Sequence, residues 1–425
     1  MSASVPLETG QAAPTAAEPS GAASAADLSG ASDTAPHGAP SADELRGEFL
    51  LDPDVVFLNH GSFGACPRPV FESYQRWQRE LEREPVEFLG RRFFDLMPAA
   101  RAALAEYVGA GADDVVYVPN ATTGINIVAR SLDLAPGDEV LVTDHAYGAC
   151  DRVWRFMCAK RGAAVRRVDI DVPVTTHEEL VDHVWASVTE ATKLVFLSHI
   201  TSVTGLVLPV AQLCARARDA GVLSLIDGAH APGQVDLDVM AVGADFYAGN
   251  CHKWLCSPKG AGFLHARPEV QDRLEPLIVS WGWENELEGV SKFIDEQEYT
   301  GTRDIAAYLA VPMAIEYQRQ RDWGAVRDRC HQLVREARER LLDFDGVSAI
   351  HPDDSSWYVQ MESVRVDCDA EPVQRALYDR FGIEVVVHGW RDTTMLRVAV
   401  QGYNSQADIN ALIEALGTLR SEGVF

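Results

Sequence analysis

Residues 223–233 have the sequence Leu-Ser-Leu-Ile-Asp-Gly-Ala-His-Ala-Pro-Gly. A short apolar run stops at Asp227 and a glycine-containing turn, which is typical of a buried strand that ends at the edge of a sheet. A carboxylate at such a strand end loses hydration unless a cationic group meets it. The pattern also fits an aspartate that only caps a turn, so this segment alone leaves the role of Asp227 open.

Similar runs rich in Val, Ile and Leu recur along the chain, each followed by a turn and an amphipathic stretch such as 211–220. The runs are Val115–Val118, Glu139–Val142, Leu194–Leu197 and Leu223–Ile226. Continuous apolar strands separated by helices predict an α/β fold with a mostly parallel sheet that is covered on both faces. In such folds ligands bind beyond the carboxyl ends of the strands.

The chain divides into three predicted parts. Residues 1–44 are rich in Ala, Ser, Pro, Gly and Thr and are expected to be disordered, because they carry too few large apolar side chains to form a core. Residues 45–304 form the predicted large domain, the first of them joining the small domain. Residues 305–425 form a smaller α+β domain, helical as far as Leu342 and followed by strand signals at 349–366 and 384–400.

Charge and composition limit the possible partners. The chain has 37 basic and 63 acidic residues, and its net charge of -26 argues against nucleic acid and anionic membrane surfaces as partners. The sequence contains no run of about 18 apolar residues, so no membrane span is predicted. The first basic residue is Arg46 and the eight cysteines are scattered. A cytoplasmic protein with reduced thiols, without a targeting segment or a metal site, is therefore expected.

Lysine is scarce, and one lysine follows a predicted strand. Residues 244–255 read Ala-Asp-Phe-Tyr-Ala-Gly-Asn-Cys-His-Lys-Trp-Leu, which places Lys253 beside His252. The four other lysines lie in a helix, before a strand, in a Pro-Gly turn and in an acidic stretch: Lys160, Lys193, Lys259 and Lys292. A lysine retained where the chain otherwise prefers arginine suggests an amine that must lose its proton, as a Schiff base requires.

Two loops have the composition of an anion site. Thr122 and Thr123 open a predicted helix directly after a strand, where free N–H groups and hydroxyls bind phosphate, although a capping threonine accounts for the pattern equally well. Gly301 and Thr302 lie in a second small-residue loop that could donate to the same phosphate. Tyr147 follows the strand at 139–142 and could stack on a planar cofactor or simply pack.

Together these segments resemble the class V aminotransferase family of fold type I enzymes, which use pyridoxal 5′-phosphate (PLP), and within it the isopenicillin N epimerase-like group. The resemblance covers about residues 50–410. It rests on the order and spacing of three segments: Leu58-Asn-His-Gly-Ser-Phe-Gly-Ala-Cys-Pro-Arg-Pro, Asp227-Gly-Ala-His-Ala-Pro-Gly and Asp245-Phe-Tyr-Ala-Gly-Asn-Cys-His-Lys-Trp.

The resemblance implies a role for each site residue. Lys253 would form the Schiff base and Asp227 would pair with the pyridine nitrogen. His230 would lie near the phenolic oxygen and Tyr147 would stack on the ring. The phosphate would be held by Thr122 and Thr123, with His252 close by and Gly301 and Thr302 reaching in from the second subunit of a homodimer.

The same resemblance points to an amino-acid substrate. Arg397 would bind its α-carboxylate through a bidentate guanidinium, although a plain surface-strand arginine is an alternative. His60, Trp281, Trp283 and Trp390 would line the pocket or pack in the core.

Several reactions at Cα stay open at this point. Racemisation, β-elimination and transamination share the same residues, and decarboxylation is a further alternative. Cysteine desulfurases of this superfamily carry a nucleophilic cysteine shortly before the small-domain arginine, but no cysteine follows Cys368 here. Relatives with the Asn-His-Gly-Ser-Phe-Gly signature include epimerases and C–S lyases, so one of these two activities is expected. A catalytically inactive binding module is disfavoured, because Lys253 and Asp227 are both present.

Overall fold

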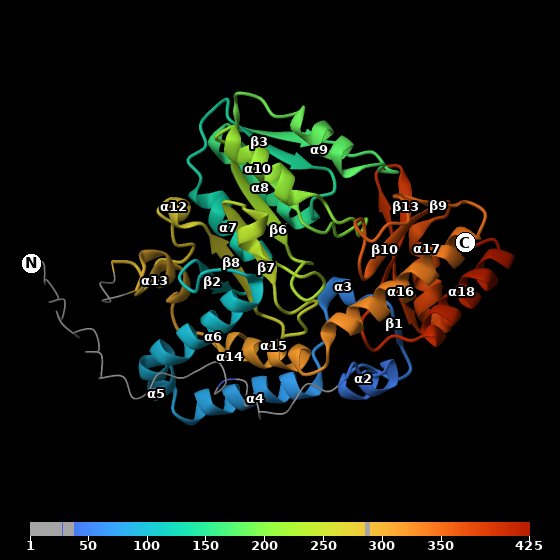
Figure 1. Cartoon of the computed structure of the whole chain (residues 1–425), viewed down its shortest axis with the longest axis horizontal. Helices are drawn as coiled ribbons and strands as arrows, with labels where there is room; N and C mark the ends of the chain where they lie inside the picture. The colour runs from blue at the N-terminus through green and yellow to red at the C-terminus, as the bar shows by residue number, and fades with distance from the viewer. Residues whose placement is uncertain (1–27, 29–37, 285–289) are drawn as a thin grey trace, which may run out of the picture.

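The computed structural model describes residues 28, 38–284 and 290–425 (Figure 1). Most of the segment expected to be disordered lies outside the described residues. Its last residues enter helix α2, Ala42–Glu48, because Ser41 and Glu44 form a capping box.

A seven-stranded sheet forms the centre of the molecule, with strand order β2-β8-β7-β6-β5-β3-β4. The strands are β2 Val115–Val118, β3 Glu139–Thr143, β4 Ala164–Val168, β5 Thr192–Ser198, β6 Leu223–Gly228, β7 Phe246–Asn250 and β8 Gly262–Ala266. The pairs from β4 through β7 are all parallel. The predicted α/β fold and its four strands are therefore confirmed.

Strand β8 was not predicted, and it changes how β2 joins the sheet. Strand β8 runs antiparallel to both β7 and β2, so β2 lies at the edge and bonds only to β8. Because two reversals restore the original direction, β2 still ends at the same edge of the sheet as β6 and β7. The turn after β2 therefore opens toward the same region as the other strand ends.

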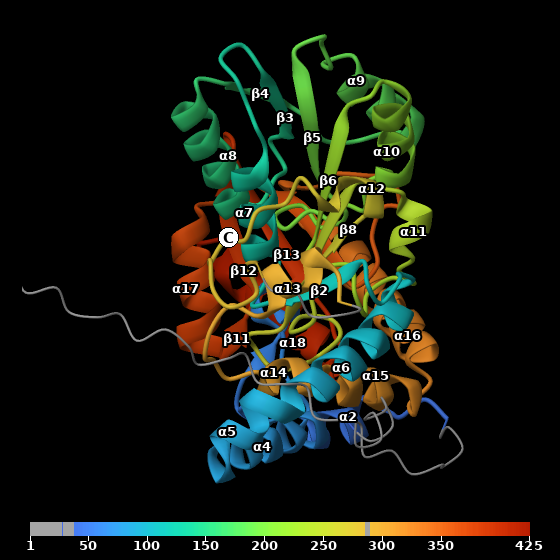
Figure 2. The same cartoon turned by 90° about the vertical axis from the view of Figure 1, so that its left-hand side faces the viewer.

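Alternating side chains of the strands bury two separate cores. Leu225 and Phe246 pack toward α7 and α8, whereas Ile226 and Tyr247 pack on the opposite face with α9 and α10. The two layers of helices are visible in Figure 2. The covering helices are α7 Ala121–Ser131, α8 Gly148–Arg161, α9 His177–Trp185, α10 Val210–Asp219, α11 Val239–Val242, α12 Pro268–Gln271 and α13 Lys292–Glu298.

The C-terminal part forms a second, antiparallel sheet with order β12-β13-β10-β9. Its strands are β9 Val347–Ala349, β10 Met361–Val366, β12 Val386–Trp390 and β13 Thr393–Ala399. Helices α16 Trp323–Leu342, α17 Ala370–Phe381 and α18 Gln406–Ser421 accompany this sheet (Figure 1). This arrangement confirms the expected smaller α+β part.

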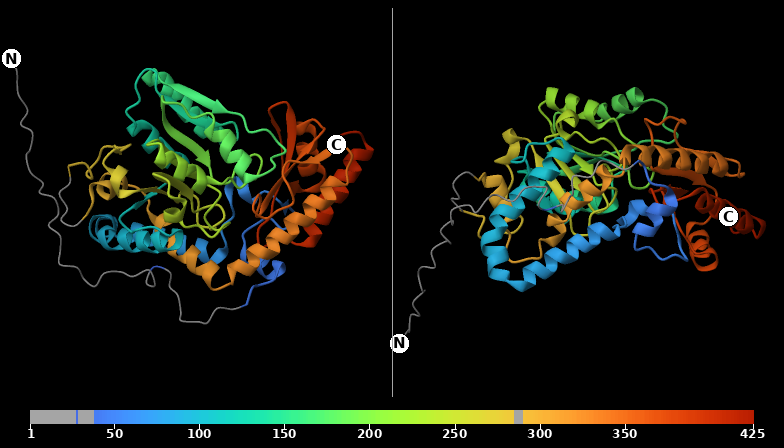
Figure 3. Two further views of the ribbon diagram at one scale, coloured as in Figure 1. Left: turned by 45° about the horizontal axis from the view of Figure 1, so that its top comes forward. Right: turned by 60° about the horizontal axis from the view of Figure 1, so that its bottom comes forward.

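Segments from both ends of the chain connect the two sheets. Strand β1, Val56–Phe57, pairs in parallel with β11, Ile383–Glu384, and so joins the N-terminal residues to the C-terminal part. The helices that precede β2 are α3 His60–Phe63, α4 Arg68–Arg83, α5 Pro85–Glu87, a π-helical turn at Phe88–Arg92 and α6 Phe93–Val108. Helices α14 Ala306–Leu309 and α15 Val311–Arg319 pack on α4 and α6 before α16 crosses to the second sheet (Figure 3). No helix in the described residues is long and apolar enough to cross a membrane.

Candidate active site

A cavity of about 220 Å³ lies at the carboxyl edge of the large sheet. It collects residues from the ends of β5, β6 and β7 and from the start of α7. Its lining is Ser62, Phe63, Asn120, Ala121, Thr122, Tyr147, Ser198, Ile200, Ser202, Asp227, Ala229, His230, Asn250, His252 and Lys253. The position agrees with the rule for ligand sites in open α/β sheets.

Lys253 follows the end of β7 by three residues, and its amine points at a histidine. The distance from Lys253 Nζ to His230 Nε2 is 3.1 Å. Burial and the neighbouring cation Arg397 lower the pKa of the lysine to about 8, and the opposing attraction of Asp227 is weaker. About a tenth of the amine is therefore unprotonated at pH 7, far more than for an ordinary lysine, and this is the form that a nucleophilic lysine requires.

Asp227 closes β6 as a buried carboxylate. Its Oδ1 accepts the N–H of Ala229 at 3.0 Å, and Cys150 Sγ lies 3.5 Å from its Oδ2. Burial raises the pKa of this carboxyl. Among the described residues Asp227 forms no ion pair within 4.0 Å, so a cationic N–H from a ligand would supply what this carboxylate lacks.

The start of α7 forms an anion site that differs in detail from the prediction. Asn120 caps the helix, because its Oδ1 accepts the N–H of Thr123 at 2.9 Å and the Thr123 hydroxyl at 3.1 Å. Asn250 Oδ1 accepts the N–H of Ala121 at 2.8 Å. Thr122 lines the cavity, and its N–H lies in the first turn, where a helix offers no acceptor. The structure therefore brings Thr122 to the cavity and turns Thr123 to the cap.

His252 and Tyr147 lie at the cavity, as expected from the sequence. His252 Nδ1 is 3.1 Å from the carbonyl of Ala261, and burial lowers the pKa of this histidine to about 4, so it is neutral. Tyr147 lines the cavity and is 46% exposed, so its ring is accessible to a planar ligand. Gly301 and Thr302 are exposed and do not line this cavity.

Arg397 is a buried cation without a carboxylate partner among the described residues. It is 3% exposed, and it donates to the Ser202 carbonyl, to Asn59 Oδ1 at 3.1 Å and to Ser62 Oγ at 3.0 Å. Among the described residues its Nε has no hydrogen-bond partner. Burial lowers the pKa of the guanidinium to about 10. Because Ser62 and Ser202 line the cavity, an anion that displaces them would neutralise this charge.

His60 lies behind Lys253 rather than in the cavity, which does not support its predicted contact with substrate. It is fully buried, with Nε2 3.0 Å from the carbonyl of Lys253 and Nδ1 3.0 Å from the Tyr403 hydroxyl. Trp390 is also buried and packs on His145, with ring centroids 4.7 Å apart. Trp281 and Trp283 are 73% and 48% exposed and do not line the cavity.

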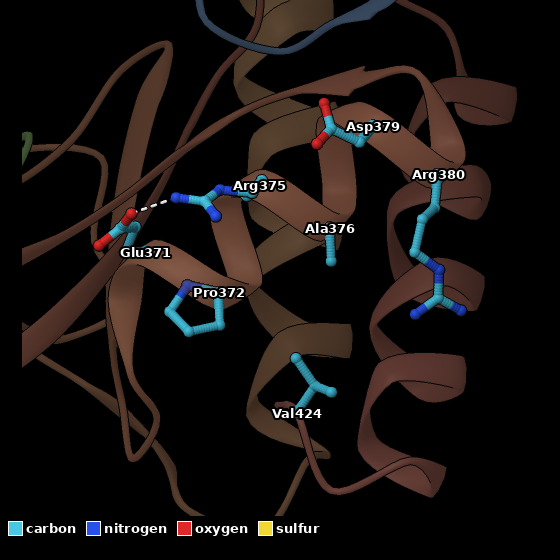
Figure 4. Close-up of a pocket in the computed structure, with 7 residues that line it drawn as sticks. All are labelled: Glu371, Pro372, Arg375, Ala376, Asp379, Arg380 and Val424. Atoms are coloured by element: carbon cyan, nitrogen blue, oxygen red, sulfur yellow. Dashed lines mark hydrogen bonds and ion pairs between the residues drawn. The ribbon is translucent and has the colours of Figure 1, made fainter.

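A wider depression of about 560 Å³ lies on the outer side of α17 and is separate from this chemistry (Figure 4). Its charged side chains form exposed pairs, such as Arg375 with Glu371 and Arg380 with Glu422. None of the residues that line the depression is buried, Asp379 included, so solvent screens their charges.

Comparison with known proteins identifies the family. The sequence model of the class V aminotransferases matches residues 66–412. The chain belongs to this family.

Its relatives include an epimerase and a putative desulfhydrase. The chain is 38% identical over 388 residues to an isopenicillin N epimerase of Amycolatopsis lactamdurans, covering 88% of this chain and 97% of the relative. It is 31% identical over 430 residues to a putative L-cysteine desulfhydrase 1 of rice, covering 91% of this chain and 88% of the relative. The solved structure of a C-DES mutant with glycine covalently linked to the PLP cofactor superposes with a TM-score of 0.77 at 23% identity, covering 89% of this chain and 99% of that one.

The cofactor of this class V enzyme is PLP, and the cavity residues fit it. The Asp227 carboxylate, which forms no ion pair among the described residues, suits a pyridinium N–H, and the N–H of Thr122 in the first turn of α7 suits a phosphate. Lys253 offers an amine of lowered pKa to the aldehyde. Asn120 and Asn250 were not predicted. The residue before Ala121-Thr122-Thr123 is a preferred helix cap and could have been found, whereas Asn250 has no local signal.

Proposed function

We propose that this enzyme epimerises an α-amino acid by removing the Cα proton on one face and adding a solvent-derived proton to the opposite face. The proposal is supported by 38% identity over nearly the whole length of an isopenicillin N epimerase. The observation that carries it is the buried guanidinium of Arg397, which has no carboxylate partner in the described chain and lies behind two serines of the cavity.

In this proposal Arg397 takes the substrate carboxylate. The guanidinium now donates to neutral acceptors, so a carboxylate would replace them by a bidentate pair in which both partners are charged. Such an exchange is worth about 1.5–3 kcal/mol. The contact would orient Cα relative to Lys253, because Arg397 lies on β13 of the second sheet and Lys253 follows β7 of the large sheet.

The other residues hold the cofactor and move the proton. Bound PLP supplies an electron-withdrawing ring that acidifies Cα. With PLP bound, Asp227 would keep the pyridine nitrogen protonated, Tyr147 would cover the ring, and Thr122 with His252 would hold the phosphate. The amine of Lys253 accepts the Cα proton, for which its pKa of about 8 is suited.

Solvent exchange tests this proposal. The PLP-loaded enzyme is incubated in D2O with a panel of L-amino acids and with isopenicillin N, and Cα deuterium and the epimeric product are followed by NMR and chiral chromatography. We expect exchange together with the epimer. Exchange with release of a keto acid would indicate transamination, and loss of CO2 without exchange would indicate decarboxylation. Either result refutes epimerisation.

A C–S lyase is the second candidate, favoured by the 31% identity to a putative L-cysteine desulfhydrase over most of both chains. A lyase would use the same Lys253 base but expel a sulfur substituent from Cβ. Incubation with L-cysteine and S-substituted L-cysteines would then release pyruvate, ammonia and a sulfide or thiol in equal amounts. Absence of all three products from the exchanging enzyme excludes this candidate.

We further propose a homodimer in which Gly301 and Thr302 complete the cavity of the partner subunit. Exposed apolar side chains surround this loop, among them Val279 at 67% and Trp281 at 73%. The two segments are adjacent, because the Gly282 N–H donates to the Tyr299 carbonyl at 3.4 Å. Val279→Asp should yield a monomer in sedimentation that binds PLP more weakly, while the matched change Val86→Asp at another exposed valine should not. A dimeric Val279→Asp variant would contradict this surface.

A further inference from the structure

Two hydrogen bonds converge on the ring of His230 from opposite sides. Trp254 Nε1 donates to His230 Nδ1 at 3.2 Å, and His230 Nε2 lies 3.1 Å from Lys253 Nζ. Trp254 is fully buried and His230 is 3% exposed, so water does not replace either contact. The same tryptophan ring also packs on His60, with centroids 4.9 Å apart.

The indole fixes the tautomer of the imidazole. An indole N–H can only donate, so the nitrogen that faces it must carry a lone pair. A proton on His230 Nδ1 would set two donors against each other at 3.2 Å in a buried site. Burial and the cations Lys253 and Arg397 also lower the pKa of His230 far below its usual value, so the ring is neutral. A neutral ring without a proton on Nδ1 carries it on Nε2.

This tautomer determines how His230 meets Lys253. With the proton on Nε2, the histidine donates and the lysine nitrogen must accept. An ammonium has no lone pair and cannot accept, whereas a free amine can. The charged groups that face this amine are Asp227 on β6 and Arg397 on β13, with Cys150 on α8 as a further titratable neighbour.

We propose that Trp254 is a positioning residue that locks His230 in the tautomer protonated on Nε2, so that His230 donates its hydrogen bond to the amine of Lys253. The proposal rests on the proposed role of Lys253 as the amine that bonds the cofactor and accepts the Cα proton. The same fixed donor would serve the phenolic oxygen of PLP. If the ring exchanged tautomers freely, part of the population would present a lone pair at Nε2 and could donate to neither the lysine amine nor the phenolic oxygen.

The first test reads the tautomer directly in the apoprotein. Histidine labelled with 15N is incorporated, and the ring signals of His230 are assigned by their loss in His230→Gln. We expect an unprotonated Nδ1 and a protonated Nε2 at pH 9, where the amine of Lys253 is mainly unprotonated and can accept. A protonated Nδ1 overturns the proposal without any variant at Trp254.

The second test uses Trp254→Phe, which keeps an aromatic ring but removes the N–H donor together with part of the indole. Competitive acetylation with mass spectrometry gives the pKa of each lysine in the apoprotein. We expect that of Lys253 to rise by about one unit in this variant, the equivalent of one lost hydrogen bond, and the His230 signals to report mixed tautomers. The matched control is Trp323→Phe, a buried indole whose Nε1 has no partner in the described chain, which should change neither readout. Unchanged tautomer and lysine titration in Trp254→Phe refutes the lock.

These measurements separate the lock from the proposed activity. They use apoprotein without substrate, so an enzyme that turns out to be a lyase or an aminotransferase leaves their outcome unaffected. Conversely, a mixed tautomer in the wild-type protein would remove the role of Trp254 and leave deuterium exchange at Cα unaffected as a test of function. If Trp254→Phe fails to fold, the wild-type spectrum alone decides.

Discussion

Replacing Arg397 by methionine should weaken substrate binding more than it weakens the fold. The fall of its pKa to about 10 corresponds to about 3 kcal/mol that burial costs the charged form. Against this stand three hydrogen bonds that the charged guanidinium donates to neutral acceptors, at Ser202, Asn59 and Ser62, worth about 1.5 kcal/mol each. The two contributions largely cancel, so Arg397→Met should lower the free energy of unfolding by no more than about 1.5 kcal/mol.

The loss of substrate affinity is expected to be the larger effect. Loss of a charge-assisted contact worth about 1.5–3 kcal/mol raises the KM of the amino acid about 10–150-fold. The assay combines urea unfolding of the PLP-loaded protein with the substrate dependence of Cα deuterium exchange. The spectrum of the bound cofactor reports that the site is otherwise intact.

Arg338 provides the matched control, since it is also a buried arginine. It differs in having a carboxylate partner, with Arg338 Nε 3.3 Å from Glu362 Oε1 and side chains 8% and 1% exposed. Arg338→Met leaves Glu362 buried without this partner, so it should destabilise the protein by about 3–5 kcal/mol. The proposed role of Arg397 is refuted if Arg397→Met destabilises the protein as much as Arg338→Met does, or if KM stays at the wild-type value.

Three further predictions concern Lys253, Arg391 in the turn between β12 and β13, and Tyr147 at the cavity rim. Because the pKa of Lys253 is lowered to about 8, its free amine fraction rises with pH, and apoprotein should take up PLP about tenfold faster at pH 9 than at pH 7; a flat stopped-flow profile would contradict this. Arg391 bridges β12 and β13 to Asp144, whose side chain is 2% exposed, so Arg391→Ala should cost about 2 kcal/mol in urea unfolding, whereas Arg375→Ala in an exposed pair should cost less than about 0.5 kcal/mol. Tyr147→Ala should weaken PLP binding about 3–10-fold in a fluorescence titration and Tyr147→Phe should not; equal loss in both variants would point to the hydroxyl instead of the ring.

The parallel strands were predictable because short apolar runs that alternate with amphipathic helices are typical of a sheet buried on both faces. Strand β8 was missed, although it is also apolar, because Gly262–Ala266 follows the Lys253 loop without a helix between them. Direction within a sheet depends on the length of the connection, and a short return after β7 forces an antiparallel strand. The antiparallel direction of β8 could therefore have been predicted from the short connection.

The site was predictable where a residue follows a strand and unpredictable where two distant segments meet. Lys253, Asp227 and Thr122 share one sheet edge, which strand order alone implies. The contact of His60 with the Lys253 carbonyl joins residues 193 positions apart, and no local pattern encodes it. Lys259, expected to be an ordinary turn residue, donates to the Gly64 carbonyl at 2.9 Å for the same reason.

The hydrogen bond between His60 and Tyr403 also sets when the site can exist during synthesis. These residues lie 343 positions apart, and the imidazole that joins them is the one that holds the Lys253 carbonyl. When only the large sheet has left the ribosome, Lys253 is already present, but Tyr403, the hydrogen-bond partner of His60, is not. Arg397 emerges equally late. The candidate active site is therefore completed last, after nearly all of the chain has left the exit tunnel. A nascent or truncated chain contains Lys253 but lacks the C-terminal residues that complete the site.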